Sequence, residues 1–561
     1  MRSLSIPSLP LLLLSSALSM GLVACSGDDS SADYASGATG DESSGGTTGA
    51  TGASATGASA SASASGTDGS GSGDPSGGVT GTGDSAGDSD SGEGTTGGDE
   101  STGTTGDDST TGDDTTTTTT GGEELCNELD DVTLFLSPDD SNSMSSPVQA
   151  REAVLGGWGG ELNWVPLRIW EFFNYYTFDY PAAESGTVIV TPELFRLDSQ
   201  LEGEYTLQIG ISSHSLSNDN RPPMNITFVL DESGSMSGSP MDMQKEACRA
   251  IAAQLKEGDI VSMVGWDTQN AVKLAGYKVT GPDDAMLLSK INALEPGGGT
   301  NLNGGLVAGY ELAQSSYDPE RINRVVLISD GGANAGVTDI DLIAGGAGSQ
   351  DEDGIYLVGV GVGDDTTYND ALMDTVTDVG KGASVFIPNK EEAWRIFGDD
   401  FVNTMAVAVR DVQVRLDMPP GFEIVKFSGE EYSSDPSEIE PQHLAPNDAM
   451  VFHQTIATCA PDLVEDDTQI TVTARFKDAI TFEVKEVQAV VTFGELLGVE
   501  SPMVRKGAAI YAYVDALKAV KSNTDPTAAK AEALARIAAA QKLLPTDPDL
   551  EEVAEILGAL D

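Results

Sequence analysis

The sequence predicts a doubly wound, Rossmann-like α/β domain, in which helices cover both faces of a parallel sheet, with further folded regions on either side. Between residues 225 and 405, short apolar runs such as "NITFVLD" and "INRVVLISD" alternate with segments of helical periodicity. Continuous apolar runs are typical of strands buried on both faces, and their alternation with helices is typical of parallel sheets. Acidic and hydroxyl residues follow these runs, where ligands bind in such sheets.

The region before this domain, residues 126–224, is expected to begin with a strand, a polar turn and a helix in "VTLFLSPDDSNSMSSPVQAREAVLGG". A dense aromatic stretch, "WVPLRIWEFFNYYTFDYP", follows it. We expect these rings to pack in a core or between domains, because aromatic side chains bury large areas. A platform for carbohydrate or peptide is the alternative. Residues 203–215 alternate in polarity and predict another strand.

Within residues 225–405, we expect helices in five segments. These are "SPMDMQKEACRAIAAQLK", "DDAMLLSKINAL", "NLNGGLVAGYELAQSS", "YNDALMDTVTD" and "KEEAWRIFGDDFVNTM". In the first of them Ala247, Ile251 and Leu255 recur at helical spacing. The segments "DIVSMVGWD", "GIYLVGVGVG" and "ASVFIP" are expected to be strands of the same sheet.

Residues 406–497 change to a period of two and predict a separate β-sandwich-like module. Residues 498–561 are rich in alanine and predict a helical hairpin or three helices. Asp525-Pro526 and Asp547-Pro548 are suitable starts for two of them, because aspartate caps a helix N-terminus and proline fits its first turn.

Residues 1–25 have the composition of an export signal, with one arginine and an interrupted apolar stretch. Residues 26–125 are mostly Gly, Ser, Thr, Ala and Asp, with 19 acidic residues and no Lys or Arg. Such a segment has little apolar surface to offset its ordering entropy, so it is expected to be a disordered linker. A flexible chain of that length spans about 50–60 Å, so it would hold the folded part away from an anchor.

The folded part is also acidic, with 70 acidic and 28 basic residues from position 126 onward. Nucleic acid is therefore excluded as an expected partner, since binding it requires a basic surface. Cysteine is sparse. Cys126 and Cys459 could form a disulfide in an oxidising compartment, whereas Cys248 lies in a helical pattern and is expected to be a buried thiol.

The end of the export signal, Leu22-Val23-Ala24-Cys25, resembles the lipobox of bacterial lipoproteins. An ordinary signal peptide with a chance cysteine is the alternative. The resemblance implies that Cys25 is lipidated and that the protein is anchored in the cell envelope through its N-terminus. Ser26, in place of aspartate after the cysteine, implies the outer membrane of a Gram-negative bacterium, on its periplasmic or surface face.

Polar residues from three segments are expected to meet at the carboxyl ends of the strands. They are Asp231, Ser233 and Ser235 in "DESGS", Thr300 after the glycines of "GGGTN", and Asp330 in "LISDGG". The spacing of two in the first segment places alternate side chains on one side of an extended loop. Hydroxyl and carboxylate oxygens suit Mg²⁺, Ca²⁺ or Mn²⁺ and not zinc.

The order Asp-x-Ser-x-Ser, a distant threonine and a later Ser-Asp-Gly resembles the metal-ion-dependent adhesion site of von Willebrand factor type A (VWA) domains. The resemblance implies Ser233, Ser235 and Thr300 as direct ligands, with Asp231 and Asp330 completing the set. It also implies a Mg²⁺ ion, with Ca²⁺ or Mn²⁺ possible, that bridges to an Asp or Glu carboxylate of a protein partner. The flanking segments resemble a bacterial subfamily of VWA lipoproteins.

These features predict a non-enzymatic envelope lipoprotein with an adhesion or scaffold role and no small-molecule substrate. A metal-independent structural or envelope-assembly protein is one alternative, and a metal-dependent hydrolase is another. The three histidines, His214, His443 and His453, do not lie near the metal motif in the sequence, and there is no phosphate-binding loop. The identity of the partner, the choice of metal and the oligomeric state stay open.

Overall fold

The structure is a computed structural model. It describes residues 131–138, 143–156, 162–197, 200–332, 354–364, 368–499 and 501–560. The lipidation site expected at Cys25, the linker expected over 26–125 and Cys126 lie outside the described residues. Within them, no helix combines the length and the hydropathy that crossing a bilayer requires.

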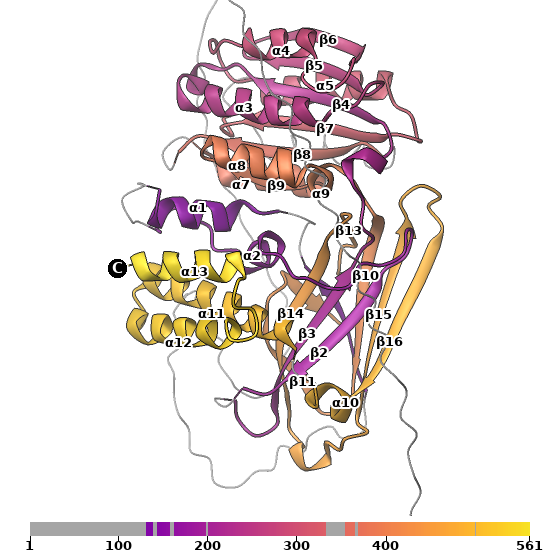
Figure 1. Ribbon diagram of the computed structural model, residues 1–561, viewed down its shortest axis with the longest axis vertical. Coiled ribbons are helices and arrows are strands. Elements are labelled where there is room, and N and C mark those ends of the chain that lie inside the picture. The colour runs from indigo at the N-terminus through magenta and orange to yellow at the C-terminus, as the bar shows by residue number, and fades with distance from the viewer. Residues whose placement is uncertain are drawn as a thin grey trace, which may run out of the picture. The chain divides into compact units, whose positions relative to one another are not determined.

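The predicted doubly wound domain is confirmed (Figure 1). Its sheet has the order β6-β5-β4-β7-β8-β9, in which β6 is antiparallel to β5 and the other neighbours are parallel. The strands are β4 (Met224–Asp231), β5 (Ile260–Trp266), β6 (Asn270–Lys278), β7 (Ile322–Ser329), β8 (Tyr356–Val362) and β9 (Ser384–Ile387). Strand β6 was not expected from the sequence, because none of the residues of this edge strand is buried.

Alternate side chains of the strands point to opposite sides of the sheet. Both faces are apolar, so helices cover both. Phe228 of β4 belongs to a core with α3 (Ser239–Gln254), α4 (Ala285–Asn292) and the segment from α8 (Lys390–Trp394) to α9 (Phe401–Met405). Val229 belongs to a second core with α5 (Leu302–Ser315) and α7 (Asp370–Val379). All eight residues of β4 are buried, as its apolar run predicts.

The two regions around this domain share one pair of sheets, although the sequence suggested separate units. Strand β1 (Val132–Ser137) pairs with β10 (Val409–Met418), and β3 (Glu204–Ser212) pairs with β14 (Ala449–Thr458). The sheet orders are β12-β1-β10-β15-β16, with β13 on β10, and β11-β14-β3-β2. Pairing between strands more than 200 residues apart leaves no mark on local periodicity, so the sequence could not show it.

The remaining strands of these sheets and one short helix have the following bounds. They are β2 (Ile189–Phe195), β11 (Phe422–Phe427), β12 (Glu431–Ser433), β13 (Gln442–Leu444), β15 (Gln469–Asp478), β16 (Val484–Thr492) and α10 (Phe493–Leu497). The inward side chains of the two sheets, among them Leu207, Leu416 and Phe452, form a common core between the sheets. The two-residue period of 406–497 therefore predicted the strands correctly.

The aromatic stretch packs with the C-terminal helices, which confirms the expected core role for most of its rings. Phe172 of α2 (Ile169–Tyr175) lies edge-on to Tyr513 of α11 (Pro502–Ser522), with ring centroids 5.7 Å apart. Trp164 is the exception, since it is 71% exposed. The same core contains α1 (Ser145–Val154), α12 (Pro526–Ala540) and α13 (Pro548–Ala559).

The predicted helix starts are confirmed as well. The Asp525 side chain accepts a hydrogen bond from the backbone of Ala528, and Asp547 accepts one from Leu550. Cys248 is a buried thiol in α3, as expected. Cys459 is disulfide-bonded, and its pairing with Cys126 stays a prediction.

Candidate metal centre

The first loop of the candidate site begins where β4 ends. The Asp231 carboxylate is buried and accepts hydrogen bonds at both oxygens. Its Oδ1 accepts from the backbone N–H of Ser233 at 2.8 Å, and its Oδ2 accepts from the Ser329 hydroxyl at 2.7 Å. Asp231 is therefore fixed in orientation by its own loop and by the end of β7.

The backbone of Asp231 is held by Gln244, a buried residue of α3. The Asp231 N–H donates to Gln244 Oε1 at 3.1 Å, and Gln244 Nε2 donates to the Asp231 carbonyl at 2.9 Å. Neither Gln244 nor Ser329 was expected to support the site. Ser329 directly precedes Asp330, which could have indicated it, but nothing in the local sequence distinguishes Gln244.

The second loop supplies Thr300, which is buried. Gly298 has a positive φ of 79°, a conformation that glycine adopts without strain, and this turn brings the loop against the first one. The backbone N–H of Gly234 donates to the Gly298 carbonyl at 3.2 Å, and that of Gly297 donates to the Glu232 carbonyl at 2.7 Å. Asn301 then caps the N-terminus of α5.

The third loop follows β7 and carries Asp330, which is 1% exposed. Its Oδ1 accepts from the backbone N–H of Gly332 at 3.1 Å. Its Oδ2 is buried and receives no hydrogen bond from the part of the chain that the structure describes. A buried carboxylate oxygen without a donor is costly, so this atom is well suited to binding a cation.

The three loops converge at Gly332. A Cβ atom placed on that glycine would lie 3.2 Å from Asp330 Oδ1, 3.5 Å from Thr300 Cγ2 and 3.9 Å from Ser235 Oγ. Ser235 Oγ is in turn 3.0 Å from Ser233 Oγ, and the backbone N–H of Ser233 donates a hydrogen bond to Asp231 Oδ1. The structure thus brings together all five side chains that the sequence singled out.

The electrostatics of this cluster favour a cation. Burial, and to a smaller extent the nearby Asp330, raise the pKa of Asp231 to about 7 against the opposing effect of hydrogen bonds from Ser329 and Ser233. No lysine or arginine forms an ion pair with either carboxylate in the described ranges; the neighbouring Lys273 pairs with Glu232 at 2.7 Å. Two buried carboxylates without a counter-charge would be stabilised by a bound metal ion.

The donor set fits a hard divalent cation. Across the described residues there is no cluster of three or more His, Cys, Asp or Glu side chains that could hold a metal. The site instead combines two carboxylates with three hydroxyls, and oxygen ligands of this kind suit Mg²⁺, Ca²⁺ and Mn²⁺. Two of the histidines make their hydrogen bonds away from this cluster. His453 is hydrogen-bonded to Gln208 at 2.7 Å, and His443 accepts a hydrogen bond from the Asp411 N–H.

Comparison with known proteins identifies the domain that carries these residues. The family model of the von Willebrand factor type A domain matches residues 225–394. The chain contains a VWA domain. VWA domains often bind a divalent metal at the adhesion site that this cluster resembles, and they typically mediate protein–protein interaction or adhesion.

The similar proteins match only part of their own length. The chain is 25% identical over 264 residues to the uncharacterized protein YfbK of Escherichia coli, covering 46% of this chain and 45% of that protein. It is 28% identical over 198 residues to inter-alpha-trypsin inhibitor heavy chain H2 of Sus scrofa, covering 33% of this chain and 21% of that protein. It thus spans less than half the length of these relatives.

Among solved structures, a von Willebrand factor type A protein from Catenulispora acidiphila is similar to this chain. The two share 17% sequence identity with a TM-score of 0.41, and the match covers 67% of this chain and 90% of that one.

Proposed function

We propose that this protein is a cell-envelope lipoprotein whose VWA domain binds protein ligands through a divalent metal ion. The observation that carries the proposal is the convergence of five oxygen-bearing side chains around Gly332, with Asp330 Oδ2 buried and lacking a donor within the described residues. Mg²⁺ is the proposed ion, and Ca²⁺ or Mn²⁺ would suit the same oxygens.

The residues of the site divide into two roles. Both oxygens of Asp231 accept hydrogen bonds from the protein, so this carboxylate mainly fixes the loop and contributes charge. Ser233, Ser235 and Thr300 would hold the ion through neutral hydroxyls, and Asp330 through its second oxygen. A metal held mostly by neutral ligands supplies residual positive charge, which attracts an Asp or Glu carboxylate of a partner.

Ser235 supports this mode of binding because it is exposed, whereas Asp231, Ser233, Thr300 and Asp330 are buried. The site is thus closed by protein on one side and open at the serine of the first loop. A partner carboxylate would approach from that open side, and nothing in the proposed binding requires a bond to be broken.

The anchor is proposed from the sequence. Lipidation of Cys25 would place the protein at the outer membrane of a Gram-negative bacterium, and residues 26–125 would separate the VWA domain from the bilayer. Replacing Cys25 with serine should move the protein from the membrane fraction to the soluble fraction. Retention of the Cys25→Ser variant in the membrane would contradict the lipid anchor without affecting the metal site.

The ligand-binding function is tested by capture on the immobilised full chain. Envelope proteins should bind in buffer with Mg²⁺, should be released by EDTA and should bind again when Mg²⁺ is restored. The Asp330→Ala variant should capture none of them, and the control Ser315→Ala, at an exposed serine of α5, should match the wild type. Equal capture by wild type and Asp330→Ala, or with EDTA present, would contradict the metal-bridged mechanism.

A further inference from the structure

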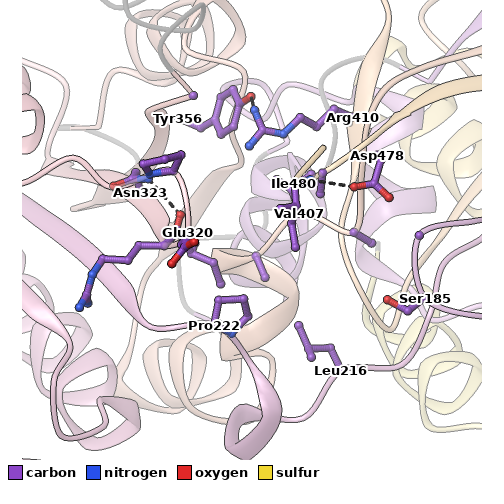
Figure 2. Close-up of a pocket in the computed structure, with 18 of the residues that line it drawn as sticks. Ser185, Leu216, Pro222, Glu320, Asn323, Tyr356, Val407, Arg410, Asp478 and Ile480 are labelled. Atoms are coloured by element: carbon purple, nitrogen blue, oxygen red, sulfur yellow. Dashed lines mark hydrogen bonds between the residues drawn. The ribbon is translucent and has the colours of Figure 1, made fainter. Parts of the chain in front are cut away.

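A second candidate site lies at the end of the VWA sheet where the parallel strands β7 and β8 begin, opposite the metal site. A cavity of ≈ 280 Å³ is lined there by the start of β7, the start of β8 and parts of the sandwich. Figure 2 shows Tyr356, Asn323 and Glu320 of the VWA domain on one side of it, and Arg410, Asp478 and Ile480 on the other. The metal site is at the opposite end of β7, after Ser329.

Arg324, the third residue of β7, lines this cavity and is 5% exposed. Its Nε is buried without a hydrogen-bond partner in the described part of the chain, and its Nη1 has one long contact of 3.4 Å to the Asn323 carbonyl. The guanidinium lies 5.1 Å from the centre of the Tyr356 ring. Burial and the nearby Arg410 lower the pKa of Arg324 to about 10.

Arg410, at the start of β10, contacts the same tyrosine from the sandwich. Its guanidinium is 5.0 Å from the Tyr356 ring centre and 4.4 Å from that of Phe482, and Nη1 donates to the Tyr356 hydroxyl (Figure 2). Its Nε is also buried and lacks a partner within the described residues. Two arginines from two domains thus meet at one aromatic ring.

Neither arginine forms an ion pair with a carboxylate in the ranges that the structure describes. The acidic groups of the cavity wall do not supply one. Asp478 accepts backbone hydrogen bonds from Thr481 and Ile480 and pairs with Lys485 at 2.9 Å, and these contacts lower its pKa. Glu320 is exposed to solvent. His214 also lines the cavity, and burial lowers its pKa, which disfavours a positive charge on it.

This arrangement is unusual for the composition of the chain. The protein has 89 acidic residues and 29 basic ones, so carboxylates are abundant, yet none pairs with these two guanidinium groups in the described structure. Removing an arginine from water without a counter-ion is costly. Guanidinium groups also match carboxylate and phosphate oxygens geometrically, which makes an anionic ligand the natural partner.

Part of the remaining cavity wall is apolar. Leu216, Pro222, Val407 and Ile480 form this apolar part, and all four are labelled in the close-up (Figure 2). A mostly apolar cavity with a few convergent polar groups is typical of small-molecule sites, and its volume is close to the lower end of their range. An inorganic ion alone would leave this apolar surface in contact with water.

We propose that the cavity binds a small organic anion, whose carboxylate or phosphate group pairs with Arg410 and Arg324 and whose apolar body contacts Pro222, Val407 and Ile480. Because Arg324 belongs to the VWA domain and Arg410 to the sandwich, the ligand would connect the two. This site is separate from the metal centre and does not rest on the function proposed for it.

The test is calorimetric titration of the full chain with benzoate, phenyl phosphate, inorganic phosphate and benzyl alcohol. Benzoate or phenyl phosphate should bind at one site, and the comparison of the two assigns the anionic group. Benzyl alcohol should bind much more weakly because it lacks the charge. In Arg410→Gln the affinity for the organic anion should fall by about tenfold or more, the usual effect of losing a charge-assisted hydrogen bond.

The matched control is Arg415→Gln, on the same strand, whose arginine is paired with Asp417 outside the cavity. It should bind like the wild type. Val407→Trp keeps both arginines and fills the cavity, so it should also abolish binding and replaces Arg410→Gln if that variant does not fold. No binding of either organic anion, equal binding by Arg410→Gln, or a preference for inorganic phosphate would overturn the proposal.

Discussion

The two ends of strand β7 carry opposite chemistry. At its carboxyl end, Asp330 and Asp231 are buried together without a basic partner in the described structure. Near its amino end, Arg324 is buried, and no carboxylate among the described residues forms an ion pair with it. The strand between them is apolar and buried, so it holds both groups rigidly and keeps them apart.

We therefore take uncompensated buried charge, and not charge alone, as the mark of a candidate ligand site. Most other buried charged residues in the described ranges form ion pairs. Arg221, for example, donates to Asp259 at 2.6 Å, and both side chains are buried. Because a buried charge without a partner is costly, its presence at both ends of β7 supports the cation site proposed at one end and the anion site proposed at the other.

The largest expected effect is at the metal end. Asp330→Ala should remove metal binding, because it deletes the carboxylate oxygen that lacks a donor in the described structure. Ser329→Ala should weaken binding by about 10- to 100-fold, as is usual when a residue that orients a ligand is lost, since its hydroxyl bonds Asp231. Titration of both variants measures this, and an unchanged affinity in Ser329→Ala would show that Asp231 needs no such support.

A second prediction concerns the helix that follows Thr300. In Gly309→Ala the added methyl would lie 2.2 Å from Val229 Cγ2, so α5 would have to shift on the sheet. The expected cost is about 1–3 kcal/mol of unfolding free energy, typical of overpacking. The control is Gly558→Ala in α13, where nothing lies within 4 Å and helix propensity predicts a gain of up to about 1 kcal/mol. Urea unfolding measures the free energy of unfolding of both variants, and a Gly309→Ala variant as stable as the wild type would contradict the prediction.

The third prediction concerns charges that are only partly compensated. Glu171, Asp370 and Asp374 share Arg168, with contacts of 2.9, 2.7 and 3.1 Å. Burial, together with the neighbouring carboxylates, raises the pKa of Asp374 to about 7 against the opposing effect of Arg168. The folded state therefore holds this proton more tightly than the unfolded chain, so stability is lost as pH rises from about 4 to 7.

The Asp374→Asn variant cannot ionise at this position, so it should not lose stability as the pH rises. The variant should be more stable than the wild type at pH 8, by about 1–3 kcal/mol, and the difference should shrink as pH falls toward 5. Urea unfolding at the two pH values measures it, with Asp462→Asn, at an exposed aspartate, as the control. A difference that stays constant with pH would mean that Asp374 is ionised throughout this range.

The smallest expected effect tests whether the two ends of β7 act separately. Arg410→Gln should leave the affinity for Mg²⁺ within about twofold of wild type, because sites that share no contacts are usually additive. Asp330→Ala should likewise leave the binding of benzoate unchanged. A larger change in either titration would show that the two sites are coupled through the sheet.

The sequence predicted one end of β7 and not the other, for a physical reason. Asp231, Ser233 and Ser235 are adjacent in the chain, and Thr300 and Asp330 each follow a glycine-rich or strand pattern, so the metal site could be assembled from local signals. Arg324 and Arg410 carry no such signal. They meet only because β10 of the sandwich lies near the start of β8, which periodicity does not show.

The same limit applies to the fold. The alternating strands and helices of the VWA domain and the capped C-terminal helices were predictable, because each depends on local periodicity and capping. The joining of β1 with β10 and of β3 with β14 was not, because it depends on pairing across an inserted domain. Gln244 was missed for a similar reason, since its role depends on α3 packing against the end of β4.

The most direct test of the central claim is calorimetric titration of Mg²⁺, Ca²⁺ and Mn²⁺ into the full chain, beside the Asp231→Ala variant. Binding of at least one of these ions at a single site in the wild type, lost in Asp231→Ala, is the result that the five-residue metal centre predicts. Absence of binding for all three ions, or equal binding by the variant, would contradict it.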